Sequence, residues 1–231
     1  MGYINSKINN IIIASCNETR NEKSNAAFIN AVRKYYPNFI YYNCFGPSNN
    51  ELPSLKSYDI EDKILAGDGI FNDNDGVGIC SVGFWARQQP NKNFIATAGH
   101  CHAPRSYYLV PWNSTPTASI GRMKNYFLEP IDFGLINIEN SDVQPVPSVR
   151  NTDSALYNEL FIKDIIPVSS NGAHLCLSGV KSHVKCGYVA ALNGFTSNGR
   201  YFRENIFVVN LRGKPGDSGG PIFSYKNLMD R

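Results

Sequence analysis

The sequence has no apolar run long enough to cross a membrane. Its longest obvious run, residues 11–14, is far shorter than the roughly 18 residues that a membrane helix needs. The sequence also has no large excess of charge of either sign. Its 22 Lys plus Arg against 19 Asp plus Glu give a net charge of +3, which argues against binding to nucleic acid or to a membrane surface. The first ten residues lack the apolar core of a signal peptide. No Cys-x-x-Cys pair suggests a zinc ribbon or a redox site.

The chain contains enough hydrophobic residues to form a folded core. Of 231 residues, 42% are hydrophobic and 12% aromatic, which excludes intrinsic disorder and is enough for one large or two modest domains. Nineteen Gly, thirteen Pro and many short β-branched or aromatic runs favour an all-β chain with tight turns. The composition therefore indicates a soluble globular protein.

Six cysteines fall into three local couples along the chain. Disulfides in an exported protein and buried thiols in a cytosolic protein both fit such spacing, and the spacing alone leaves the choice open. The couples are Cys16 with Cys44, Cys80 with Cys101, and Cys176 with Cys186.

Residues 1–63 differ from the rest in their hydrophobic pattern, which indicates strand, helix and strand. A short apolar strand is expected at 10–15, and a helix over 24–36, where Phe28, Ile29, Val32 and Tyr36 share one face. Pro37 ends this helix, because the residue before proline avoids the α region. A strand at 39–42 and a polar linker at 46–63 follow.

From residue 64 onwards the pattern is one of short strands and turns without helical periodicity. Such a pattern predicts a barrel or a sandwich. Residues 139–170 show no clear pattern. Strands are expected at 80–86, 94–98, 107–110, 118–123, 132–138, 173–177, 187–192, 201–210 and 221–225.

Three short motifs contain residues suited to acyl transfer. His100 follows an apolar strand in Thr-Ala-Gly-His-Cys, Asp132 opens another apolar run, and Ser218 lies in the turn Gly-Asp-Ser-Gly-Gly. A serine hydroxyl needs an imidazole to accept its proton, and the imidazole needs a carboxylate to set its tautomer. Glycines beside the serine let backbone N–H groups reach an oxyanion. Each residue alone has a structural explanation, but the ordered set predicts a nucleophilic site.

Residues 64–223 resemble the chymotrypsin-fold serine peptidases, and more closely the branch of streptogrisins and α-lytic protease. The resemblance rests on the start Ile-Leu-Ala-Gly-Asp-Gly-Ile-Phe at residues 64–71, on the two cysteine loops, and on the His and Ser motifs. It implies an all-β, two-barrel trypsin-like domain over 64–231, with a small α+β pro-domain-like segment and linker over 1–63. Cleavage near the Lys63–Ile64 bond would release the mature peptidase.

The same resemblance assigns roles to residues. His100 is implied as general base, Asp132 as its orienting carboxylate and Ser218 as nucleophile, with the backbone N–H groups of Gly216 and Ser218 as the oxyanion hole. Disulfides Cys80–Cys101 and Cys176–Cys186 are implied by the two loops, whereas Cys16–Cys44 is a weaker expectation.

Two departures from the family pattern stand out. Leu177 occupies a position that is usually Arg, which leaves the partner of the buried Asp217 unidentified; Lys181, Lys185 and Lys214 are the candidates. The sequence also ends at Arg231, eleven residues after Gly220, so we expect an incomplete second barrel and weak or no peptidase activity.

The sequence therefore predicts a secreted serine endopeptidase that acts through an acyl-enzyme, as a monomer, on protein or peptide substrates. No cofactor and no metal are expected, since His102, His174 and His183 have no companions at metal-ligand spacing and are expected on the surface or in loops. The alternative is a non-catalytic, truncated protease-like binding protein. A disulfide-stapled lectin-like protein would explain the cysteines but not the ordered His, Asp and Ser.

Overall fold

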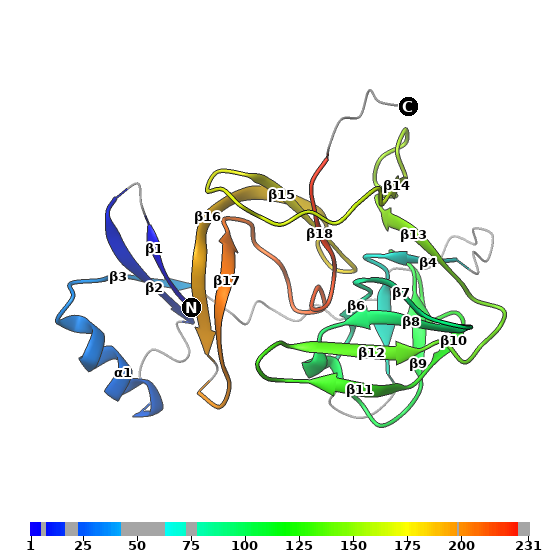
Figure 1. Cartoon of the computed structure of the whole chain (residues 1–231), viewed down its shortest axis with the longest axis horizontal. Helices are drawn as coiled ribbons and strands as arrows, with labels where there is room; N and C mark the ends of the chain where they lie inside the picture. Colours follow the sequence, from blue (N-terminus) through cyan, green and yellow to red (C-terminus); the bar gives the residue numbers. More distant parts are fainter. Residues whose placement is uncertain (6–7, 17–22, 43–62, 73–77, 198, 226–231) are drawn as a thin grey trace. The chain divides into compact units, whose positions relative to one another are not determined.

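A computed structural model describes residues 1–5, 8–16, 23–42, 63–72, 78–197 and 199–225 (Figure 1). Most of their regular structure is short β-strands, which confirms the mainly-β expectation. In these ranges, no helix combines the length and the apolar character that crossing a membrane requires. The chain divides into two compact units. The first contains Met1–Glu51, Pro167–Ala173 and Tyr188–Asn210; the second contains Leu52–Ile166, His174–Gly187 and Leu211–Arg231.

The first unit begins with a hairpin and a crossover. Strands β1 (Gly2–Asn5) and β2 (Asn10–Cys16) pair antiparallel, and β2 pairs in parallel with β3 (Asn38–Tyr42). Helix α1 (Lys23–Arg33) lies between β2 and β3 in sequence, because parallel neighbours need a long connection (Figure 1). The apolar centre of β2 is buried. The strand predicted over residues 10–15 is therefore present, and the burial of its apolar centre explains the apolar run in the sequence.

Helix α1 ends three residues earlier than predicted. Tyr36 adopts a left-handed φ of 50°, outside the right-handed helical region that a residue before proline avoids. Tyr36 consequently lies outside the helix and is 85% exposed, so its predicted place on the apolar face is wrong. Phe28 does use that face: its ring meets Phe195 edge-on, with centroids 6.2 Å apart.

A second hairpin completes the first unit. Strand β16 (His183–Ser197), whose residues from Tyr188 onwards belong to this unit, pairs antiparallel with β17 (Phe202–Val209). Gly2 of β1 pairs with Phe195 of β16, which gives the order β3-β2-β1-β16-β17. Strands β1, β2 and β3 therefore share a sheet with part of the segment that resembles the peptidases. Residues 43–62, with Cys44 and most of the expected linker, lie outside the described residues.

In the second unit, two four-stranded sheets share one core. Their orders are β10-β9-β5-β6 and β11-β12-β8-β7. Ile70, Leu109 and Ile120 from the first sheet pack with Ile95 and Ile136 from the second. The strands are β5 (Gly69–Phe71), β6 (Cys80–Ser81), β7 (Phe84–Gln88), β8 (Lys92–Thr97), β9 (Tyr107–Val110), β10 (Ser119–Gly121), β11 (Met123–Phe127) and β12 (Phe133–Asn137).

A third sheet comes partly from the region without a clear sequence pattern. Strand β13 (Gln144–Arg150) lies between β14 (Glu159–Phe161) and β4 (Lys63–Ala66) and runs parallel to β4. Pro145 and Pro147 interrupt the strand pattern of β13, and its pairing with β4 is irregular between Pro145 and Val149. These prolines explain why the strand was not predicted.

The remaining strands of this unit form an open arrangement. Strand β15 (His174–Gly179) pairs antiparallel with the short β18 (Ile222–Phe223). Among the described strands, β18 pairs only with β15, and no sheet closes on itself. An incomplete second barrel is therefore confirmed for this part of the chain.

A buried ion pair connects β13 to the turn after β4. Asp68 is fully buried, and its Oδ1 accepts a short hydrogen bond from Arg150 Nε. Its Oδ2 accepts hydrogen bonds from Arg150 Nη2 at 3.4 Å and from the Leu65 N–H at 2.8 Å. Burying two charges is favourable only when they are paired and hydrogen-bonded, so this contact constrains the packing of β4 against β13.

Candidate active site

His100 lies on a single turn of 3₁₀ helix, η1 (Gly99–Cys101), directly after β8. The buried Tyr107 of β9 fixes the end of this turn: its hydroxyl donates to the Cys101 carbonyl and accepts from the Ala103 N–H, both at 2.7 Å. Burial raises the pKa of the Tyr107 hydroxyl, against a smaller lowering by the Ala103 hydrogen bond. The hydroxyl therefore stays protonated and can keep donating.

Asp132 reaches His100 because of the register between two strands. It directly precedes β12, and Gly134 of β12 pairs with Thr97 of β8, so the residue before β12 lies next to the turn after β8. The His100 N–H donates to Asp132 Oδ1 at 2.8 Å, and the His100 Nδ1 lies 2.7 Å from Oδ2. The neutral ring that fits this contact has its proton on Nδ1, which leaves Nε2 able to accept one. The His100 side chain is 50% exposed.

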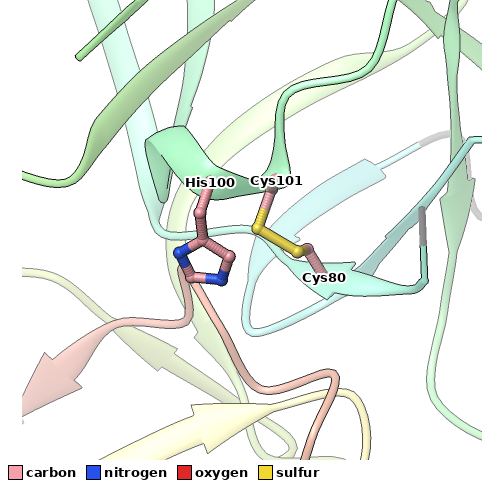
Figure 2. A group of neighbouring side chains, drawn as sticks. All are labelled: Cys80, His100 and Cys101. Carbon is pink, nitrogen blue, oxygen red and sulfur yellow. A yellow bond between two sulfur atoms is a disulfide. The ribbon is translucent and has the colours of Figure 1, made fainter. Parts of the chain in front are cut away.

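The structure contains both disulfides that the family resemblance implied. Cys80 of β6 is bonded to Cys101 of η1, with Cα atoms 6.3 Å apart, and Cys176 is bonded to Cys186. Figure 2 shows the His100 ring beside the Cys80–Cys101 bond. This bond fixes η1 to β6. The pair Cys16–Cys44 stays a prediction, because Cys44 lies outside the described residues.

Ser218 lies in the turn before β18, and its backbone is fixed to the same strand β6. Its carbonyl accepts from the Ser81 N–H at 2.7 Å and lies 4.0 Å from Cys101 Sγ. The Ser81 hydroxyl donates to the Gly216 carbonyl at 2.8 Å. Within the described ranges, no hydrogen bond joins the Ser218 hydroxyl to His100. The structure thus pairs His100 with Asp132 and places the Ser218 backbone beside Cys101.

Two glycines shape this turn (residues 214–219), which we call the nucleophile turn after the role predicted for Ser218. Gly216 and Gly219 have φ values of 109° and 87°, which disfavour any other residue. A Cβ on Gly219 would also lie 2.1 Å from Thr97 Oγ1. The N–H groups of Gly216 and Ser218 donate no hydrogen bond to any described residue, whereas the Asp217 N–H donates to the Lys214 carbonyl. Two neighbouring donors are therefore available to a ligand.

The partner of Asp217 differs from the sequence prediction. No lysine ammonium pairs with it among the described residues. Instead its Oδ1 accepts from the backbone N–H groups of Lys181 and Ser182 at 3.0 and 2.9 Å, and its Oδ2 accepts from the Lys214 N–H at 2.6 Å. Three amides satisfy the buried carboxylate, so no cation is needed to replace the arginine that Leu177 displaces.

Sequence reasoning missed three buried polar residues that support the site. Ser81 is fully buried and also accepts from the Val180 N–H at 3.0 Å, while the Thr97 hydroxyl donates to the Ser81 carbonyl at 2.8 Å. Tyr107 is the third. Ser81 directly follows Cys80, and Thr97 lies three residues before His100. The sequence signal that could have identified them is a polar residue within an apolar strand next to a motif residue.

A hollow of about 240 Å³ adjoins Asp132. It is partly apolar and opens to solvent. Its lining residues are Gly83, Phe84, Ala96, Thr97, Ala98, Asp132, Phe133 and Gly219.

Two groups of histidine and cysteine have potential ligand atoms within 4.8 Å of one another: Cys80 with His100 and Cys101, and His174 with Cys176 and Cys186. In each group both sulfurs are bonded to each other, so neither supplies the thiolate that zinc prefers. The other histidines have aromatic partners: His102 stacks on Tyr126, and His183 stacks on Trp112.

No protein-family model matches the chain. Sequence comparison finds Serine protease 2 of Streptomyces fradiae, 29% identical over 164 residues, which cover 70% of this chain and 88% of that protein. Structure comparison finds Thermobifida fusca Protease A, with a TM-score of 0.56 and 22% identity over 70% of this chain and 78% of that one. It also finds the α-lytic protease homologue N4, with a TM-score of 0.54 and 21% identity over 69% and 79%.

The two kinds of comparison agree on one fold and one group of enzymes. The structural neighbours are bacterial proteases with the chymotrypsin fold, and the sequence relative is a serine protease. The chain therefore has the fold of the bacterial chymotrypsin-fold proteases, and its sequence is similar to that of a streptogrisin-type serine protease.

Proposed function

We propose that the chain is a secreted serine endopeptidase that cleaves peptide bonds through an acyl-enzyme on Ser218. The observation that carries the proposal is the His100–Asp132 pair, with Nδ1 2.7 Å from the carboxylate and half of the His100 side chain exposed. This is the arrangement that a general base for a serine hydroxyl requires. The Ser218 backbone beside Cys101 supports the same assignment.

The reaction follows from these roles. Ser218 Oγ attacks the peptide carbonyl while its proton passes to His100 Nε2, and the Asp132 carboxylate stabilises the imidazolium. The C–N bond then breaks, and the leaving amine takes the proton from His100. Water attacks the resulting ester with His100 again accepting a proton, and collapse of the intermediate returns a proton to Ser218 and releases the acid.

The N–H groups of Gly216 and Ser218 are the proposed oxyanion hole. Neither donates to a described residue, so both are available to the oxygen that becomes negative in the tetrahedral intermediate. The positive φ of Gly216 and Gly219 supports this assignment, because it lets the backbone rather than a side chain face the substrate.

One observation favours the non-catalytic alternative. No hydrogen bond joins the Ser218 hydroxyl to the His100 ring among the described residues, although such bonds often tighten only when substrate binds. A fluorophosphonate separates the two functions, since it reacts with an activated serine and would leave a binding protein unlabelled. We expect the chain to be labelled and to hydrolyse a casein-derived peptide mixture slowly, because the described strands leave the second barrel open. Ser218→Ala should abolish both activities, and Ser224→Ala, at an exposed serine six residues away, should preserve both.

We also propose that residues 1–63 are a pro-domain-like segment that templates the peptidase domain, residues 64–231. Support comes from the first unit, where Gly2 pairs with Phe195 and Phe28 packs on the same ring. A specific protease site inserted between residues 43 and 62 would allow the link to be cut. We expect the two fragments to co-elute in gel filtration after cutting, and their separation would contradict a templating role.

Secretion, a monomeric state and peptide substrates complete the proposal. Two disulfides in the described residues are typical of an oxidising compartment, and the small net charge gives no reason to expect nucleic acid as a partner. Thiol titration of the purified chain in denaturant should find no reactive cysteine, and light scattering should give the monomer mass.

A further inference from the structure

The nucleophile turn depends on a second turn, residues 180–183, within the loop closed by Cys176–Cys186. Lys181 and Ser182 of this turn donate both N–H bonds that reach Asp217 Oδ1. Asp217 lies between Gly216 and Ser218, the two residues of the proposed oxyanion hole. The position of the 180–183 turn therefore sets the position of the carboxylate, and with it the direction of both flanking N–H groups.

The 180–183 turn is not a conformation that its own residues favour. His183 has a left-handed φ of 54°, which is uncommon for a residue other than glycine. The Ser182 hydroxyl is buried and has no hydrogen-bond partner among the residues that the structure describes, which costs free energy. Contacts from elsewhere must therefore hold the turn in place.

His183 supplies such contacts on two sides. Its Nδ1 lies 2.8 Å from Asp153 Oδ2, and its ring stacks on Trp112 with centroids 4.2 Å apart and planes 4° from parallel. Trp112 is itself fixed, because it is buried and its Nε1–H donates to the Gly67 carbonyl at 2.6 Å. The ring is thus held between a carboxylate and an anchored indole.

We propose that His183 is a positioning residue for the nucleophile turn, holding the 180–183 turn against Asp153 and Trp112 so that its amides orient Asp217. The proposal rests on the proposed peptidase function. His183 is remote from the bond being cleaved and acts only through Asp217. Its effect should therefore appear in the stabilisation of the oxyanion, which lowers kcat, rather than in substrate binding.

The test compares His183→Asn with His174→Asn. Asparagine tolerates the left-handed region, so His183→Asn removes the ring without adding backbone strain. His174→Asn makes the same exchange two residues before the disulfide loop and should behave as the wild type. We expect His183→Asn to lower kcat roughly tenfold with KM nearly unchanged, since displacements of about 1 Å near a site cost up to 10²-fold. Amide hydrogen exchange at Lys181 and Ser182, followed by NMR, should become at least tenfold faster.

A second variant covers the outcome in which His183→Asn does not fold. Asp153 is 57% exposed, so Asp153→Ala should fold and should reproduce part of both effects; adding it to His183→Asn should change little. Wild-type kcat and wild-type exchange in both single variants would overturn the proposal. If the wild type neither hydrolyses peptides nor reacts with a fluorophosphonate, the peptidase function fails, and the exchange rates still decide whether His183 holds the turn.

Discussion

Replacing Asp68 by alanine should strongly destabilise the second unit. Asp68 is fully buried and is bonded to Arg150 and to the Leu65 N–H, while the Arg150 side chain is only 6% exposed. Asp68→Ala removes the carboxylate from a buried guanidinium and leaves a buried N–H without its acceptor.

The size of the effect follows from these two losses. Breaking a buried ion pair by removing one partner costs about 3–5 kcal/mol. A buried N–H without a partner adds about 1–3 kcal/mol. We therefore expect the free energy of unfolding to fall by at least about 4 kcal/mol, which is roughly 8–16 °C in Tm for a domain of this size.

Tryptophan emission is suited to this measurement. The chain contains two tryptophans, Trp85 and Trp112, and both lie in the second unit, so emission during urea unfolding reports on that unit alone. Asp142→Ala, at an exposed aspartate of the same unit, is the matched control and should change stability by less than about 0.5 kcal/mol.

A double variant separates loss of the pair from loss of packing. Asp68→Ala combined with Arg150→Met removes both charges, and replacing a buried pair by apolar groups is often close to neutral, so more than half of the lost stability should return. A loss below about 1 kcal/mol for Asp68→Ala would refute the reasoning, because it would show that Arg150 does not depend on this carboxylate.

Three further substitutions test the surroundings of the site. Gly219→Ala should abolish fluorophosphonate labelling, because its Cβ would lie 2.1 Å from Thr97 Oγ1 at a φ of 87°; labelling at the wild-type rate would contradict that geometry. Ser81→Ala leaves the buried Gly216 carbonyl without its donor and should cost about 2 kcal/mol in urea unfolding, with slower labelling; an unchanged midpoint would argue against this link. Tyr107→Phe should remove part of the loss of stability above about pH 10. There the unfolded Tyr107 ionises at its ordinary pKa while burial keeps the folded hydroxyl protonated, so stability falls as pH rises; identical alkaline unfolding curves would count against this assignment.

The residues of the candidate site were predictable because each lies in a short local motif. His100 ends a strand, Asp132 opens one and Ser218 lies between glycines, and each pattern is complete within about six residues. Strand β9 was predicted with its observed bounds for the same reason: its run of aromatic and apolar residues is short and uninterrupted.

What the sequence did not predict depends on contacts between distant segments. Asp68 and Arg150 are 82 residues apart, and two of the three amides that hold Asp217 come from residues 35 and 36 positions earlier. A backbone donor has no sequence signature. The search for a cationic partner therefore named Lys181 and Lys214 for their ammonium groups, whereas their backbone N–H groups hold Asp217. Strand β13 was missed because its stability comes from parallel pairing with β4, which its own proline-containing sequence does not reveal.

The most direct test of the account is to locate the adduct after reaction with a fluorophosphonate. Tryptic digestion should yield a peptide over residues 213–226, since the Lys214–Pro215 bond resists trypsin, and this peptide contains both Ser218 and Ser224. Fragmentation by mass spectrometry distinguishes the two serines. The account predicts a single phosphonyl group on Ser218, which is absent when His100 is replaced by alanine. An unlabelled chain, or a label that persists without His100, would contradict the proposal that His100 and Asp132 activate Ser218.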